Sequence, residues 1–115
     1  MRIKTVRLKV TEYNDKNLIE RLKKNPKELD SYINYVVREY RKEQNLDVLL
    51  DCLKVAVMAK RGRATCIAKT ANLDRSGVYK ALSNNAKPRI DTFQKILYGI
   101  GLNLAITKVK FSQVA

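Results

Sequence analysis

Two stretches of the chain carry apolar residues at steps of three and four, a period that is typical of helices burying one face. The first stripe is Leu29, Tyr32, Ile33, Val36, Val37 and Tyr40, and the second is Leu46, Leu49, Leu50, Leu53, Ala56 and Val57. Asn25 as N-cap, Pro26 at the first helical position and Glu28 three residues after the cap predict the start of the first helix. Gln44-Asn45 separates the two helices, and Gly62 offers a left-handed stop after the second.

Shorter elements flank this pair. Asp15 can cap a helix that ends near Asn25, because proline disfavours helix in the residue before it. After residue 62 the pattern predicts a helix over 64–71, a helix from an Asp74 cap to about Ser83, and a helix from residue 90 to a stop at Gly101. The expected fold is therefore mainly α.

At both ends of the chain the apolar period changes to two, which is typical of a half-buried strand. This alternation covers Thr5 to Val10 and again Leu102 to Phe111. Each segment is too short to be stable alone. We therefore expect the two terminal strands to pair, within a subunit or across a dimer.

The charge of the chain indicates the kind of partner it binds. It has 24 Lys and Arg against 11 Asp and Glu, which give a net charge of +13. The excess is uneven: residues 1–24 carry +5, residues 25–57 carry −1 and residues 58–115 carry +9. Such an excess over one contiguous half indicates a polyanionic partner, with nucleic acid ahead of an anionic membrane surface. No stretch is apolar enough for a membrane span or a secretory leader, so we expect a cytoplasmic protein.

The residue types present argue against an enzyme. There is no histidine, and two cysteines are too few for a disulfide scaffold, so we expect Cys52 and Cys66 to be small buried residues and expect no metal or other cofactor. None of the four glycines stands in a phosphate-binding pattern. Asp47 and Asp51 lie four apart on one helix face, but no nucleophile or metal ligand joins them, and solvated charges explain them better.

Residues 64–83 carry the most informative motif. Two short helices joined by a tight turn need a small residue where their axes cross and apolar anchors beyond it, and Ala68, Leu73 and Val78 stand at that spacing. Asn72 suits the turn, since asparagine tolerates a positive φ. The spacing predicts a helix-turn-helix whose second helix exposes donors for phosphates or base edges. The candidate DNA-binding residues are Arg61, Arg63, Thr65, Cys66, Lys69, Asp74, Arg75, Ser76, Gly77, Tyr79, Lys80, Lys87 and Arg89.

Several sequence motifs together resemble a known family. They are Leu22-Lys23, Tyr32-Ile33-Asn34, Ala59-Lys60-Arg61-Gly62, Thr65-Cys66-Ile67-Ala68, the stretch from Arg75 to Leu82, and the stretch from Thr92 to Leu104. The most specific of them is the Arg-x-x-x-Tyr-Lys-Ala-Leu pattern of residues 75–82. With these motifs, residues 18–107 resemble the addiction-module antidote family, which comprises Hig-type antitoxin-like, prophage helix-turn-helix proteins of the larger phage-repressor-like class.

The resemblance implies a DNA-binding antitoxin that represses its own operon and restrains a RelE-like ribonuclease toxin. We expect three regions: an N-terminal strand and helical extension over 1–45, a phage-repressor-like helix-turn-helix DNA-binding domain over 46–102, and a C-terminal strand or tail over 103–115. The family usually has Gln at the position of Cys66 and commonly Glu at that of Ser76. The operator sequence that this chain reads is therefore expected to differ from those of family members that have Gln and Glu at these positions.

We expect a homodimer that docks on phosphates and inserts the Arg75–Lys80 helix into the major groove of a palindromic operator, because two such helices multiply specificity. The six acids of residues 25–57 make that region the expected toxin contact. Tyr35 lies off the apolar stripe and is expected to contact a partner, whereas Tyr32 and Tyr40 are expected in the core. Two alternatives stay open: a prophage-type repressor without a toxin, and a protein-binding module whose helix-turn-helix is only a scaffold.

Overall fold

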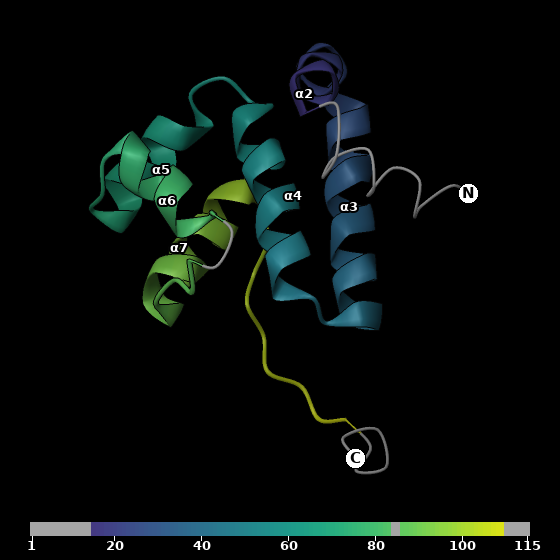
Figure 1. Cartoon of the computed structure of the whole chain (residues 1–115), viewed down its shortest axis with the longest axis vertical. Helices are drawn as coiled ribbons and strands as arrows, with labels where there is room; N and C mark the ends of the chain where they lie inside the picture. Colours follow the sequence, from purple (N-terminus) through teal and green to yellow (C-terminus); the bar gives the residue numbers. More distant parts are fainter. Residues whose placement is uncertain (1–14, 84–85, 110–115) are drawn as a thin grey trace.

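The computed structural model describes residues 15–83 and 86–109, and this part of the chain is mainly helical. Its helices are α2 (Asp15–Lys24), α3 (Pro26–Glu43), α4 (Leu46–Met58), α5 (Arg63–Ala71), α6 (Arg75–Ala81) and α7 (Ile90–Ile100) (Figure 1). The expected helices are therefore present. Their ends differ by a few residues, since α4 ends at Met58 and α6 at Ala81. None of the described helices is long and apolar enough to cross a membrane.

Asn72 and Gly101 end α5 and α7 in the left-handed conformation, as predicted, with φ angles of 59° and 103°. Gly62 is also left-handed, with φ of 81°, but it is the N-cap of α5, and α4 ends earlier at an Ala59 cap in the right-handed conformation, so the stop predicted at Gly62 is wrong. A positive φ at the end of a helix turns the next N–H groups back onto its last carbonyl groups. Gln44 also has a positive φ, of 55°, and its N–H bonds to the carbonyl of Tyr40 at 2.8 Å. Glutamine is not a typical residue for a left-handed helix end. The sequence therefore predicted that the helix ends near Gln44 but did not predict the left-handed conformation of this residue.

Asn25 is the N-cap of α3 and Pro26 its first residue, as predicted, but the expected capping box, in which the side chains of Asn25 and Glu28 bond each other's backbone N–H groups, is absent. Asn25 makes no side-chain cap on α3, and its Nδ2 instead donates to the carbonyl of Arg21 at 2.8 Å. Glu28 accepts from Nε and Nη2 of Arg21, at 3.1 Å and 2.8 Å. The capping box is therefore wrong, and the physical reason is that a two-pronged guanidinium bonds a carboxylate more strongly than a backbone N–H does.

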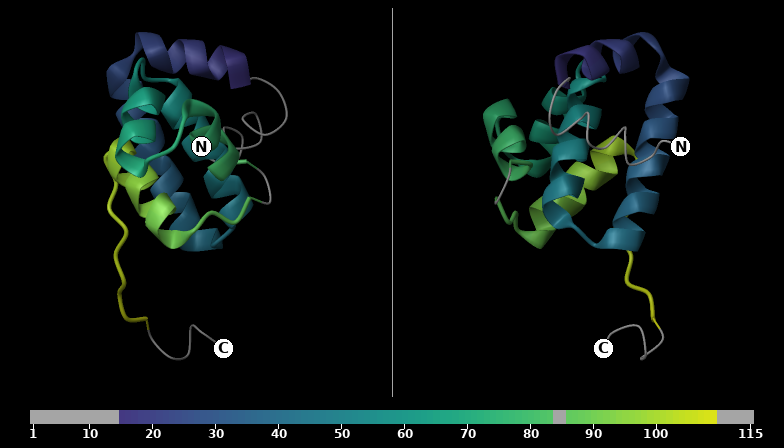
Figure 2. Two further views of the ribbon diagram at one scale, coloured as in Figure 1. Left: turned by 90° about the vertical axis from the view of Figure 1, so that its left-hand side faces the viewer. Right: turned by 45° about the vertical axis from the view of Figure 1, so that its right-hand side comes forward.

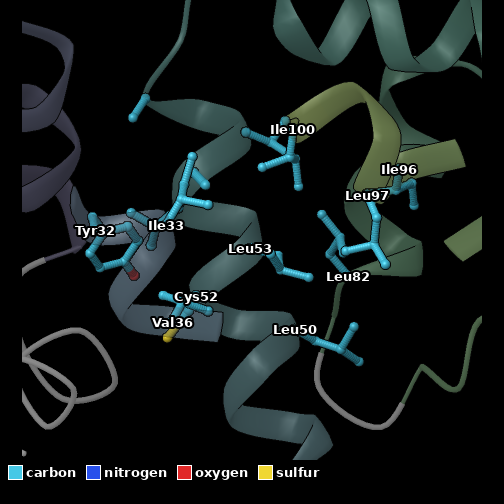
Figure 3. Packing of buried hydrophobic residues seen from close by; sticks show 14 of the residues in the cluster. Tyr32, Ile33, Val36, Leu50, Cys52, Leu53, Leu82, Ile96, Leu97 and Ile100 are labelled. Carbon is cyan, nitrogen blue, oxygen red and sulfur yellow. The ribbon is translucent and has the colours of Figure 1, made fainter. Parts of the chain in front are cut away.

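The core is centred on α4, which packs against α2, α3, α5 and α7. Leu50, Leu53 and Val57 of α4 are each at most 1% exposed. Figure 3 shows the apolar side chains of α3 on one side of α4 and those of α7 on the other. Burying a side chain of this size contributes about 1.5–3 kcal/mol. The two apolar stripes of the sequence therefore meet along α4.

Three expectations about burial were wrong or only partly right. Tyr35 is buried at 9% exposure, because α4 packs closely enough on α3 for Tyr35 to line the same small cavity as Val48 and Cys52. Tyr32 is buried as expected, and Tyr40 is partly buried against the core. Cys52 is buried as expected, but Cys66 is exposed, because α5 faces the core with its other side, which carries Ala64, Ile67 and Ala68.

Residues 102–109 form no strand, which corrects the prediction for the described part of the C-terminal segment. Of the apolar side predicted for it, Leu102 packs against the core, whereas Leu104 is 36% exposed and Ile106 is 99% exposed. A strand needs a neighbour to satisfy its backbone groups, and no described segment pairs with this one. From the end of α7 it runs past α4 and extends beyond the helices in the direction away from α2 (Figure 1). The predicted strand from Thr5 to Val10 lies outside the described residues.

Candidate nucleic-acid interface

A tight turn joins α5 to α6. The N–H groups of Asn72 and Leu73 bond to the carbonyls of Lys69 and Ala68, at 3.3 Å and 2.8 Å, which is the Schellman pattern of a helix end. Asp74 then caps α6, with its Oδ1 accepting from the N–H of Gly77 at 2.7 Å. A Cβ on Gly77 would lie 3.1 Å from that oxygen. Glycine at 77 therefore lets the turn close tightly.

The apolar anchors of this turn are partly as predicted. Ala68 and Val78 are buried, at 5% and 0% exposure. Leu73 is 36% exposed, because it lies in the turn itself rather than on either helix. The α5–α6 pair packs against α7 through Ile67 of α5, where Gly99 of α7 leaves room that a Cβ would fill.

The outer faces of α5 and α6 carry most of the candidate residues. Thr65, Cys66 and Lys69 are exposed on α5, and Arg75, Ser76 and Lys80 are exposed on α6. Gly77 and Tyr79 are half-buried between these faces and the core. The left view of Figure 2 looks from the side on which α5 and α6 lie in Figure 1, with α2 above them. The two helices thus present a polar surface of hydroxyl, ammonium and guanidinium donors.

A hollow at the edge of this surface gathers positive charge from three parts of the chain. Lys23 comes from α2, Lys60 and Arg61 come from the turn before α5, and Arg75 comes from the first position of α6. Thr65 and Tyr79 also line it, and among the described residues no acid does. We call this site the basic hollow. Four cations meet there, and within the described residues Lys23 alone of the four has an ion-pair partner, Glu20 at 3.7 Å, so the hollow is attractive to anions.

The remaining candidates lie apart from the basic hollow. Lys87 has a φ of 49° and is exposed in the segment before α7. Arg89 is the N-cap of α7, and its Nε and Nη2 contact the carboxylate of Asp91 at 3.2 Å and 3.3 Å. Lys87 and Arg89 therefore flank α7 rather than the turn, and the guanidinium of Arg89 already has a partner.

Arg63 is more buried than the other basic candidates. Its Nη1 donates to the carbonyl of Ala56 at 3.2 Å, near the end of α4, and the residue is half-buried. Burial lowers the pKa of its guanidinium, and the charge of Asp30 acts in the opposite direction. Arg63 therefore helps to hold the turn from Ala59 to Gly62 in place.

Few acids lie on this side to neutralise the cations. Residues 58–115 contain eleven Lys and Arg but two Asp and no Glu. Asp74 is engaged as the α6 cap and Asp91 contacts Arg89. Within residues 15–83 and 86–109, none of Arg61, Arg75 and Lys80 forms an ion pair. The outer side of α5 and α6 is therefore strongly basic.

Sequence reasoning found part of the basic hollow and missed part of it. Arg61, Thr65, Arg75 and Tyr79 were candidates, and the structure brings them together. Lys60 was missed although it stands beside Arg61, and the run of cations around Gly62 is a signal that would have included it. Lys23 is far away in the sequence, and no local pattern connects it to α6.

Comparisons with known proteins place the whole helical region in one family. The family described as "probable addiction module antidote protein" matches residues 11–108, which include every described helix. A relative from Haemophilus influenzae, described as an uncharacterized protein, is 27% identical over 85 residues that cover 74% of this chain and 81% of the relative. No solved structure matches the chain significantly. As the motifs of residues 18–107 predicted, the chain belongs to the probable addiction module antidote protein family.

Proposed function

We propose that this protein is a DNA-binding antitoxin that represses its own operon and neutralises a RelE-like ribonuclease toxin. In this proposal α5 and α6 act as a phage-repressor-like helix-turn-helix, and α6 enters the major groove of a palindromic operator. The protein works in the cytoplasm as a homodimer and by binding rather than catalysis. The antidote family supports the toxin-antitoxin role and implies a toxin partner.

The basic hollow is the observation that carries the DNA-binding part. A protein that follows a phosphate backbone needs several cations on one face, and Lys23, Lys60, Arg61 and Arg75 meet there beside the start of α6. Arg75 and Lys80 are exposed on α6 and can reach base edges, while Thr65 and Lys69 of α5 can reach phosphates. Arg61 beside them, and Lys87 in the segment before α7, are expected to contact phosphates of the DNA backbone. Arg63 and Arg89 contribute less, because their guanidinium groups already bond within the protein.

The homodimer follows from the size of one reading helix. A helix as short as α6 contacts a few base pairs, whereas two such helices separated by one turn of DNA, roughly 34 Å, read a longer site. The extended residues 102–109 offer backbone groups and exposed apolar side chains for pairing with a second copy. A chain ending at Gly101 is expected to lose dimerisation, which sedimentation measures.

The toxin contact is proposed on the side of α3 and α4, where the net charge is lowest. Of the six acids there, Glu28 already bonds Arg21, and Glu39 is buried with Lys42 at 3.9 Å. Glu43 and Asp47 are exposed, near the end of α3 and the start of α4, whereas Asp30 lines a hollow with four cations. The two exposed carboxylates can attract a basic toxin to this side and away from the strongly basic α5–α6 side.

The DNA-binding part is tested with the DNA upstream of the gene and a scrambled duplex of the same length. The wild-type protein is expected to prefer the upstream sequence, and Arg75→Ala to cost about 1–3 kcal/mol of affinity for it while affecting the scrambled duplex less. Lys95→Ala removes an exposed cation from α7 outside the basic hollow and serves as the control. Unchanged affinity of a folded Arg75→Ala variant would show that α6 does not read the bases.

The toxin part is tested by co-expression with the neighbouring gene. The wild-type protein and Arg75→Ala should both rescue growth and co-purify with the toxin, because Arg75 lies on α6 and the proposed toxin contact lies on α3 and α4. Replacing Asp47 with Asn should weaken co-purification. If no neighbouring gene is toxic, the protein is a repressor without a toxin partner. If toxin binds but DNA does not, the α5–α6 pair is a scaffold.

A further inference from the structure

The basic hollow includes a lysine from the helical extension that precedes the α5–α6 pair. Lys23 of α2 lines it together with Lys60, Arg61 and Arg75. A second hollow shares Lys23, Lys60 and Arg61 and adds Arg63 and the acid Asp30. The two hollows therefore form one basic surface that continues from α6 across the turn of residues 59–62 to the last turn of α2.

We infer that Lys23 and Lys60 bind phosphate groups of the DNA backbone next to the groove that α6 enters, so that α2 is part of the nucleic-acid interface. This inference rests on the proposed DNA-binding function and extends it to a helix that a helix-turn-helix alone does not include. Its occupant is DNA backbone, because the cations come from separate elements along an open surface and match a row of phosphates better than one small ion.

Lys23 is held in position by the packing of its neighbours. Leu22 is 3% exposed and belongs to the core cluster, so the last turn of α2 is anchored to the rest of the molecule. The N–H of Asn25 bonds the carbonyl of Leu22 at 3.2 Å, and Nδ2 of Asn25 bonds the carbonyl of Arg21. A lysine on an anchored turn loses less freedom when it binds a phosphate than one on a loose segment does.

Lys60 and Arg61 stand on a turn that is fixed at both ends. The N–H of Lys60 bonds the carbonyl of Val57 at 3.4 Å, and the N–H of Arg63 bonds the carbonyl of Lys60 at 3.1 Å. Gly62 closes the turn with a φ of 81°, and the side chain of Arg63 bonds the carbonyl of Ala56. The side chains of Lys60 and Arg61 remain exposed on this fixed turn.

The acids near Lys23 and Lys60 do not cancel this charge. Glu20 lies 3.7 Å from Nζ of Lys23, and both side chains are largely exposed, so the pair is weak and a phosphate can replace the carboxylate. Asp30 lines the second hollow, where four cations surround it. The surface therefore stays positive from α2 to α6.

The test compares two double variants that remove the same charge. Lys23→Ala with Lys60→Ala removes the proposed phosphate contacts, and Arg38→Ala with Arg41→Ala removes two exposed cations from the far half of α3. Binding to the upstream and scrambled duplexes is measured at several salt concentrations, and thermal melting checks that each variant is folded.

The Lys23/Lys60 variant is expected to lose affinity for both duplexes alike, by about eightfold per lysine at about 0.1 M salt, and to lower the salt slope by about 1.8. The Arg38/Arg41 variant should bind nearly as the wild type does. Replacing both lysines with arginine should restore binding, because arginine keeps the charge.

Three results would overturn the inference. Wild-type affinity and salt slope in the folded Lys23/Lys60 variant would show that α2 does not contact DNA. The same loss in the Arg38/Arg41 variant would show a general charge effect. Loss of toxin rescue with unchanged DNA affinity would assign the surface to the protein partner. If the wild-type protein binds neither duplex, the proposed DNA-binding function fails, and this inference fails with it.

Discussion

The α2–α4 region and the α5–α7 region use their carboxylates in similar ways but are left with different surfaces. In the first, Glu28 bonds Arg21, Glu20 lies near Lys23, and Glu39 is buried beside Lys42. In the second, Asp74 caps α6 and Asp91 contacts Arg89. The second region has many more cations than acids, and both of its acids are already engaged in these contacts. Arg61, Arg75 and Lys80 are therefore left without an acidic partner among the described residues.

This difference shows that net charge alone does not describe the surface a segment presents. Residues 25–57 have a net charge of −1, yet two of their six acids are already held by arginine or lysine. The α2 helix is also mixed, because its last turn carries Lys23 into the basic hollow. The boundary between the basic surface and the nearly neutral one therefore runs through the helical extension.

The largest expected effect is a loss of folding stability when the core of α4, on which both regions pack, is weakened. Leu53 is 1% exposed in the centre of α4, and Leu53→Ala should lower the free energy of unfolding by about 2–5 kcal/mol. Since α4 packs on both regions, denaturation followed by circular dichroism should remain a single transition. Leu46→Ala is the control, because Leu46 is 40% exposed on the same helix. Two transitions would instead indicate that residues before and after position 45 unfold as separate units. The boundary at residue 45 stays a prediction.

The next effect is confined to the α5–α7 region. A Cβ at residue 99 would collide with the side chain of Ile67, which is 1% exposed and has little room to move. Overpacking costs about 1–3 kcal/mol, whereas alanine gains about 0.5–1 kcal/mol over glycine within a helix. Gly99→Ala should therefore destabilise the protein. Adding Ile67→Ala should recover part of the loss in a double-mutant cycle, and simple additivity would contradict this close contact.

Two N-caps allow a smaller comparison of the regions. Asp74 accepts from Gly77 N–H at 2.7 Å, and Asn45 accepts from Val48 N–H at 3.2 Å. Replacing either with Ala should cost about 1 kcal/mol in thermal or chemical unfolding. The Asp74 change should cost more, since a charged acceptor lies at the positive end of the helix dipole. An equal or larger loss at Asn45 would show that the charge of the cap is unimportant.

The smallest effect concerns pH and lies in the α2–α4 region. The hydrogen bond from Arg21 holds the pKa of Glu28 below its ordinary value. The pair therefore stabilises the folded state above the pKa of Glu28 in the unfolded chain, and this contribution is lost as the pH falls through the lower folded pKa. The melting temperatures of wild type and Glu28→Gln should differ slightly at neutral pH and converge in acid. A pH-independent difference, or one that persists in Arg21→Ala, would exclude the ion pair as its cause.

Local patterns predicted the elements of the fold well. The stripe of α3 and the stripe of α4 are visible because a helix repeats every 3.6 residues, and Asn72 and Gly101 end their helices through their own backbone preferences. The Asp74 cap was likewise visible, since a short acceptor reaches an N–H three residues ahead. Each of these features depends on residues a few positions apart.

Predictions failed where the outcome depended on a partner elsewhere in the chain. Tyr35 is buried because of how close α4 lies, and Glu28 meets Arg21 instead of capping α3. Residues 102–109 have the alternation of a strand but no described neighbour to pair with. Periodicity indicates which face of an element is apolar, and it does not indicate what covers that face.

The same distinction divides the candidate interface. The helices, the tight turn with its Asn72 and Asp74 ends, and the basic charge of the second half are predictable from the amino-acid order alone, because propensity, capping and composition are local or additive properties. The packing of the helices is what makes Arg63 bond the end of α4, leaves Cys66 exposed, and brings Lys23 to Arg61 and Arg75 in one hollow. Those outcomes depend on how α2 and α5 pack around α4, and packing brings together residues whose separation along the chain carries no signal.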